Sequence, residues 1–179
     1  RSWGGDEEEP KDWTVQCRDD REPLPGGTIG LWTGSATVRF AHLNARRLEA
    51  TDKGSEPLYR SDFSEVDPGQ LPPYWQTRGG LWLRDTMDKL AVLRQMQVRS
   101  GPDFVDSALA LVGWSGYTVS AKAIAHPGPG KWGVGVVAYY SNDGSNYRLR
   151  VLDGRLYVVK QLAGGRVQTL AAANVEVKR

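Results

Sequence analysis

The feature that most constrains the fold is a series of short segments in which apolar and polar residues alternate. Residues 13–18, 117–124 and 147–151 alternate in this way and are expected to be strands. Asp143-Gly144 and Asp153-Gly154 stand between strand-like segments, and Asp-Gly at such a place is a strong signal for a hairpin. Short strands with turn signals about every eight to twelve residues predict an antiparallel β-sandwich or a barrel. Only residues 85–99 leave a short helix open as an alternative to a strand.

The chain has 179 residues, a length that fits one domain with a sizeable core. We expect residues 12–179 to form a single β-sandwich domain. Residues 1–11 contain an acidic run between glycine and proline, and this composition predicts a linker or a mobile arm. Trp3 is unusual in such an arm, because flexible arms seldom contain tryptophan. It either packs on a nearby surface or anchors the arm to a partner. The predicted assembly arm consists of Trp3, Asp6, Glu7, Glu8 and Glu9.

The sequence lacks the features that mark several classes of function. A net charge of +2 is too small for a nucleic-acid footprint unless the charges cluster, and no apolar run has the length of a membrane span. His42 and His126 are the two histidines, and neither belongs to a nucleophile motif or a zinc-binding spacing. Cys17 is the single cysteine, so an internal disulfide is excluded. We therefore predict no catalytic residues and no required cofactor. Calcium is the one metal that acidic loops suggest, with Asp62, Asp67 and Asp143 as candidate ligands.

Side-chain alternation assigns faces to the predicted strands. In residues 147–151 the apolar residues share one face, and Arg148 and Arg150 share the other. The pattern predicts one sheet face carrying Lys122, Tyr139, Arg148 and Arg150, with Gln161 as a further member. Two interpretations stay open. The arginines either cover the face with their stems, or they bind sugar hydroxyls, carboxylated sugars or acidic residues such as those of the arm.

Aromatic residues extend this candidate site. The chain contains seven Trp and seven Tyr, which are the residues that stack on sugar rings and populate protein interfaces. Trp114, Trp132 and Tyr139 are the candidates for stacking on a sugar beside Arg148, Arg150 and Lys122.

A family resemblance lies in four runs of the chain. They are Gly116-Tyr117-Thr118-Val119-Ser120-Ala121-Lys122, Gly133-Val134-Gly135-Val136-Val137-Ala138-Tyr139-Tyr140, Asn146-Tyr147-Arg148-Leu149-Arg150 and Gly154-Arg155-Leu156-Tyr157-Val158-Val159-Lys160. Together they resemble the central strands of laminin-G-like, concanavalin A-type jelly rolls. Residues 25–34, with residues 38–43, resemble the closing strands of that fold. The resemblance implies a jelly roll, and in bacteria such domains occur in secreted carbohydrate-active and adhesive proteins. It therefore implies an extracellular or cell-surface location.

The order of these segments departs from the family. The segment that resembles the closing strands, within residues 12–48, precedes the opening and central strands, within residues 56–171. Three explanations stay open: a circularly permuted domain, a piece of a tandem array, or strands exchanged between protomers. Head-to-tail exchange that does not close on itself would produce a filament.

The sequence thus predicts a non-catalytic extracellular module that binds carbohydrate or a protein partner. The alternative is a structural subunit of an extracellular filament or surface array, made from copies of itself by terminal strand exchange. A jelly-roll glycosidase is a third alternative. It needs two facing carboxylates, whereas the polar sheet face carries Lys and Arg.

Overall fold

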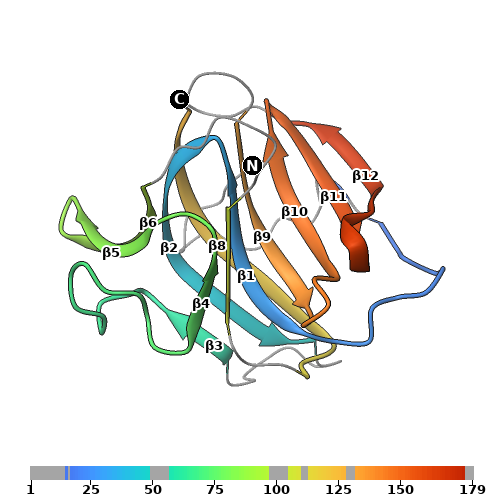
Figure 1. Ribbon diagram of the computed structural model, residues 1–179, viewed down its shortest axis with the longest axis horizontal. Helices are drawn as coiled ribbons and strands as arrows, with labels where there is room; N and C mark the ends of the chain where they lie inside the picture. The colour runs from blue at the N-terminus through green and yellow to red at the C-terminus, as the bar shows by residue number, and fades with distance from the viewer. Residues whose placement is uncertain are drawn as a thin grey trace.

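The computed structural model describes residues 15, 17–48, 57–96, 105–109, 113–127 and 132–175, with only the backbone described for residues 105–109 and 127. Two antiparallel sheets pack face to face in the arrangement shown in Figure 1, so the predicted all-β sandwich is confirmed. The strands are β1 Thr28–Gly34, β2 Ala36–Arg47, β3 Pro57–Ser61, β4 Trp75–Arg78, β5 Trp82–Met87, β6 Leu90–Gln95, β7 Val105–Leu109, β8 Tyr117–Pro127, β9 Gly133–Tyr140, β10 Asn146–Leu152, β11 Arg155–Gln161 and β12 Val167–Asn174.

The large sheet has the strand order β12-β11-β10-β9-β1-β7-β4. The small sheet has the order β3-β2-β6-β5, and β8 also pairs with β2. Val38 and Phe40 of β2 pair with β6 on one side and with β8 on the other. Strand β8 therefore lies along the side of β2 opposite to β6. The face of each sheet that is directed at the other sheet is called its inner face below.

The segment predicted to hold closing strands supplies a central strand to both sheets. Strand β1 lies between β9 and β7 and is buried over its whole length. After Gly34 the chain turns at Ser35, which has φ 47°, and enters the small sheet as β2. Along β2, Val38 and Phe40 are buried while Arg39 and Ala41 are half-buried, as the period of two in a strand requires.

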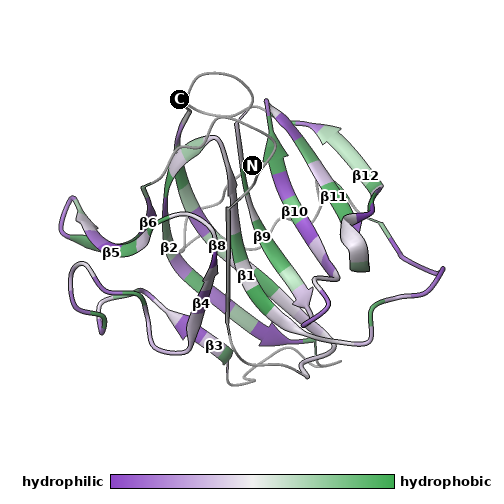
Figure 2. Cartoon of the chain, in the orientation of Figure 1, coloured by the Kyte–Doolittle hydropathy of each residue, from purple (hydrophilic) through white to green (hydrophobic). Residues whose placement is uncertain are grey.

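The main core lies between β1 and β9 of the large sheet and β2, β5, β6 and β8 of the small sheet. Ile29 and Leu31 meet Val38 and Phe40 there, and the ring of Phe40 stacks on Trp82 with centroids 5.9 Å apart. In the hydropathy colouring of Figure 2, green apolar bands also run across β10, β11 and β12, beyond this core.

Some local expectations need correction. The segment 85–99 contributes to the β5–β6 hairpin, so the helix alternative is wrong for residues 85–95. A strand expected over residues 13–18 is not seen at Val15, Cys17 or Arg18. The predicted assembly arm, Trp3, Asp6, Glu7, Glu8 and Glu9, lies outside the described residues. In the part of the chain that the structure describes, no helix has the length and apolar character needed to cross a membrane.

Candidate functional site

The predicted polar face is divided between the two sheets. Arg148 and Gln161 lie together on the outer face of the large sheet, where the Arg148 Nη2 donates to the Gln161 Oε1 at 2.6 Å. Arg150 follows on the same face of β10. Lys122 is exposed on β8 of the small sheet, in register with Ala41. The prediction that Lys122 shares a face with the arginines is therefore wrong, because alternation assigns a side but not a sheet.

Tyr139 also leaves the predicted face, and a β-bulge is the reason. The pairing of β1 with β9 shifts register between Thr28 and Gly30, and Tyr139 has φ 55°. The irregular backbone turns the Tyr139 ring to the interior, where it stacks on Tyr117 with centroids 4.9 Å apart. Its amide donates to the Tyr117 hydroxyl at 2.6 Å. Burial raises the pKa of Tyr117 to about 12.

The other two predicted aromatic residues serve the core. Trp114 and Trp132 are half-buried and pack against the main core cluster. Trp114 contacts Tyr117 edge to face, with centroids 6.1 Å apart and an interplanar angle of 80°. Neither residue is brought beside Arg148 or Arg150, so the structure does not assemble the predicted sugar platform from them.

The outer face of the large sheet instead carries an arginine–aromatic row, made of Trp32, Arg150 and Tyr157 with Arg148 and Arg155 beside them. In register, Trp32 lies opposite Gly135, Gly135 opposite Arg150, and Arg150 opposite Tyr157. The Arg150 guanidinium carbon lies 5.3 Å from the Trp32 ring centroid and 5.9 Å from that of Tyr157. Arg148 lies 5.9 Å from Trp32, and Arg155 lies 5.6 Å from Tyr157. Each distance is within the range of a cation–π contact.

Glycines on β9 make room for this row. A Cβ atom at Gly133 would lie 2.6 Å from the Trp32 ring, and one at Gly135 would lie 2.4 Å from the Leu149 carbonyl oxygen. Trp32 is fully buried, so its ring is not available to stack on a sugar. The accessible members of the row are Arg150, Tyr157 and Arg155.

Arg150 is the electrostatically perturbed member of the row. Burial, together with the positive charge of Arg148, lowers the pKa of Arg150. Its Nε has no hydrogen-bond partner among the described residues. Two neighbouring guanidinium groups of which one is incompletely bonded favour an anionic group at this place, such as a carboxylate or a sulfate.

A buried ion pair lies on the inner face of β10 and β11 and was not predicted from the sequence. Lys160 is 3% exposed, and its Nζ lies 2.8 Å from the Asp19 Oδ2. It also donates to the Glu22 carbonyl oxygen. The Tyr147 hydroxyl donates to the same Asp19 oxygen at 2.6 Å, and the Leu24 amide donates to that hydroxyl at 3.0 Å. These bonds hold residues 19–24 against the inner face of the large sheet. The available signal was Lys160 itself, a lysine in a strand that is otherwise rich in apolar residues, where a buried charge needs a partner.

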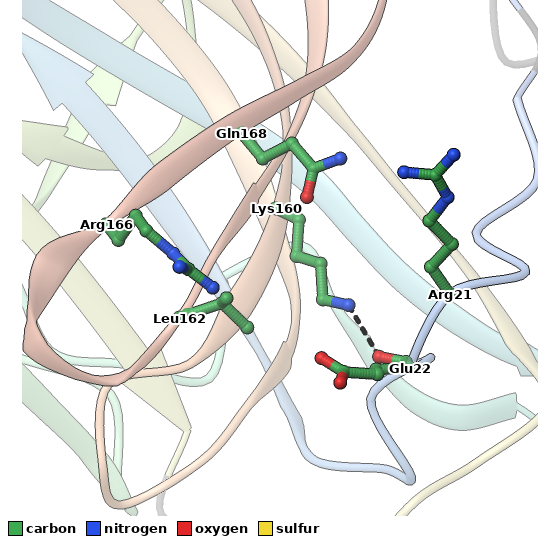
Figure 3. Close-up of a pocket in the computed structure, with 6 residues that line it drawn as sticks. All are labelled: Arg21, Glu22, Lys160, Leu162, Arg166 and Gln168. Atoms are coloured by element: carbon green, nitrogen blue, oxygen red, sulfur yellow. Dashed lines mark hydrogen bonds between the residues drawn. The ribbon is translucent and has the colours of Figure 1, made fainter.

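The same lysine lines a polar cavity of about 450 Å³, shown in Figure 3. Arg21 and Glu22 border it from the N-terminal segment, and residues of β11, β12 and their connecting turn border it from the other side. The lining residues are Arg21, Glu22, Lys160, Leu162, Arg166 and Gln168. Lys160 is already bonded to Asp19 and to the Glu22 carbonyl oxygen. The other two cationic residues that line the cavity are the exposed Arg21 and Arg166, and these are the ones placed to contact an anion.

One side of the sandwich is open. One inner row of the large sheet runs Leu31, Val136, Leu149, Val158 and Ala171 across β1, β9, β10, β11 and β12. Exposure is 0% at Leu31 but 42% at Leu149. Of the described hydrophobic residues that pack against the main core, none lies on β10, β11 or β12.

Among the described strands, β8 is the last of the small sheet on this side, which explains the exposure. Within the described ranges, β8 pairs with β2 alone. Ala123 lies opposite the buried Phe40 and is therefore on the inner face, yet it is exposed. In Figure 1, β11 and β12 lie on the side of the molecule away from β3, β4, β5 and β6. The open side is defined here as the edge of β8 that is unpaired among the described residues, together with the exposed or half-buried inner-face residues Leu149, Val151, Leu156, Val158 and Ala171.

Of the candidate calcium ligands, Asp62 and Asp67 lie in the connection between β3 and β4, and Asp143 lies in the turn between β9 and β10. The Ser64 hydroxyl donates to Asp62 at 2.6 Å, and Asp143 accepts from the Ser141 hydroxyl and, at 2.8 Å, from the Ser145 amide. These turn hydrogen bonds lower the pKa of both carboxyls. Asp67 accepts through its backbone carbonyl from the Gln70 amide at 3.1 Å. Among the described residues, no three acidic, histidine or cysteine side chains form a group that could hold a metal ion.

Comparison with protein-family models, with curated proteins and with solved structures gives no match for this chain.

Proposed function

We propose that this chain is a non-catalytic binding module of jelly-roll type that takes a protein partner by β-strand addition at the open side. The carrying observation is an edge of β8 that no described strand pairs with, beside an apolar inner face. A free edge presents unpaired N–H and C=O groups in a row, and an added strand satisfies them. The alternate side chains of that strand would cover Leu149 and Val158. An extracellular setting stays a prediction from the family resemblance.

Burial explains why the open side favours a partner. Leu149 is 42% exposed, and neighbouring Val151, Leu156 and Val158 are only half-buried. Covering apolar surface stabilises a complex by about 25 cal/mol per Å² removed from water. A strand on β8 would gain this term in addition to its backbone hydrogen bonds.

A peptide experiment tests this function. The probe is a ten-residue peptide with valine at every second position and threonine or glutamate between. The control has the same composition with its valines consecutive. Binding is measured by fluorescence anisotropy, and amide hydrogen exchange shows whether β8 becomes protected. We expect the alternating peptide to bind and to protect β8. Equal binding of both peptides, or of neither, would contradict the proposal.

Two adjacent residues give matched variants. Ala123 is on the inner face of β8 and Ile124 on the outer face, and both are exposed. Ala123→Glu places a charge where the added strand must bury its side chains, so it should abolish peptide binding. Ile124→Glu places the same charge on the other face and should leave binding unchanged. Both variants are expected to fold, since neither side chain is buried.

A second candidate function is binding of an acidic carbohydrate at the arginine–aromatic row. The incompletely bonded Arg150 beside Arg148 favours it, with Tyr157 as the accessible ring. A glycan array that compares carboxylated and sulfated sugars with neutral ones tests it. Arg150→Gln should remove binding, whereas Arg60→Gln, an equal charge change on exposed β3, should not. Equal signals from acidic and neutral sugars would exclude this candidate.

A further inference from the structure

We infer that the strand accepted at the open side is the segment Trp13–Arg18 of a second copy of this chain. The inference rests on the proposed function and names its partner. Added strands are recognised through alternate side chains, and this segment has the required pattern. Trp13, Val15 and Cys17 alternate with Thr14, Gln16 and Arg18. Six extended residues span about 20 Å, which fits within the length of β8.

The position of the segment supports exchange between copies. Asp19 is bonded to Lys160 and Tyr147, so the base of the segment is held to the surface of its own molecule. Beyond it, Val15, Cys17 and Arg18 lie in no strand, and Cys17 is exposed. Val15, Cys17 and Arg18 therefore do not pair with the β8 of their own molecule, and one edge of that β8 is unpaired among the described residues. A donor and an acceptor at different places on one chain are the two halves of a head-to-tail contact.

The side chains on the two strands are complementary in size. The inner face of β8 carries the small residues Ala121 and Ala123, whereas Leu149 and Val158 line the facing sheet. An antiparallel pairing with Val15 opposite Ala121 places Trp13 opposite Ala123. The bulk of Trp13 and Val15 then lies over the small side chains. In this register Thr14 lies opposite Lys122 and Gln16 opposite Ser120, so no like charges face each other.

Cys17 provides a direct test, because it is the single cysteine and it is exposed. Strand parity forbids an inner residue of one strand from lying opposite an outer residue of the next. Val119→Cys, Ala121→Cys and Ala123→Cys place a second thiol on the inner face, and Thr118→Cys and Ser120→Cys place it on the outer face. Each full-length variant is oxidised mildly at alkaline pH and analysed without reductant. We expect disulfide-linked dimers from one or two inner positions and none from the outer positions.

Self-association of the full chain gives a second measurement that does not depend on oxidation. Sedimentation velocity over a range of concentrations should show dimers and larger species of the unmodified protein. Val15→Glu places a charge against the apolar inner face and should weaken association about tenfold or more. Gln16→Glu makes the adjacent change on the polar side of the segment and should leave association within about twofold of the unmodified protein.

The outcomes separate the inference from the function on which it rests. A disulfide that forms within one molecule would overturn the inference, because the segment would then close its own β8. A chain that stays monomeric at high concentration, or equal crosslinking from inner and outer positions, would also overturn it. If the alternating peptide still bound in any of these cases, the strand-accepting function would stand with a different partner. If the alternating peptide also failed to bind, both the inference and the strand-accepting function would be contradicted.

Discussion

Replacing Asp19 with asparagine removes the charge that compensates Lys160. Their atoms are 2.8 Å apart, and the lysine side chain is 3% exposed and the aspartate 11%. At an effective dielectric constant of about 20, the attraction at this distance is about 6 kcal/mol, and desolvation of both groups offsets part of it. Removing one partner of a buried pair costs about 3–5 kcal/mol. Asparagine still accepts the hydrogen bond from Tyr147, so we expect a loss of about 3 kcal/mol, at the lower end of that range.

Urea denaturation followed by circular dichroism measures this loss, with Asp20→Asn as the matched control. Asp20 is paired with Arg18 in solvent, with 70% and 88% of the side chains exposed. Such pairs contribute about 0–1 kcal/mol. At about 2–4 °C per kcal/mol, Asp19→Asn should lower the melting temperature by roughly 6–12 °C. Equal stabilities of the two variants would refute the reasoning that Asp19 anchors residues 19–24.

The pH dependence of the same variant has a defined sign. Hydrogen bonds from Lys160 and Tyr147 lower the pKa of Asp19 below its usual 3.8. The stabilisation is therefore present above the pKa of the unfolded chain and is lost as the pH falls through the lower pKa of the folded protein. The difference between the unmodified protein and Asp19→Asn should be full at neutral pH and should vanish in acid. A difference that persisted in acid would assign it to packing rather than to charge.

Two further predictions concern β9 and the tyrosine stack. Gly135→Ala would place a Cβ atom 2.4 Å from a backbone oxygen of β10, and it should cost about 1–3 kcal/mol by overpacking in the same urea assay. The pKa values of Tyr117 and Tyr147 are raised to about 12, chiefly by burial. Because folding favours the neutral phenols, their stabilising contribution is complete below pH 10 and is lost as the pH rises from 10 towards 12. Ultraviolet titration should show two tyrosines ionising together with alkaline unfolding, and two ionisations before any unfolding would contradict this.

Alternation predicted the strands and their sides well, because it follows directly from backbone geometry. Val38 and Phe40 on β2, and Arg148 and Arg150 on β10, have the faces that their spacing indicates. The position of Tyr139 could not be predicted in this way. The bulge at Tyr139 arises because the pairing of β1 with β9 shifts its register, and these two strands are about a hundred residues apart in the sequence. Lys160 was predictable in part, since its inward position required a partner, but nothing local identified Asp19 as that partner.

The open side could not be predicted from alternation, for a physical reason. Leu31 and Leu149 occupy the same inner row of the large sheet, yet their exposures are 0% and 42%. Alternation records which side of a strand is apolar, whereas burial depends on how many strands the opposing sheet provides. The small sheet reaches as far as β8, within the described residues, and the large sheet continues through β10, β11 and β12. An apolar face that the described strands leave uncovered supports the proposal that a partner covers it. The edge of β8 that is unpaired among the described residues supports the proposal that this partner adds a strand.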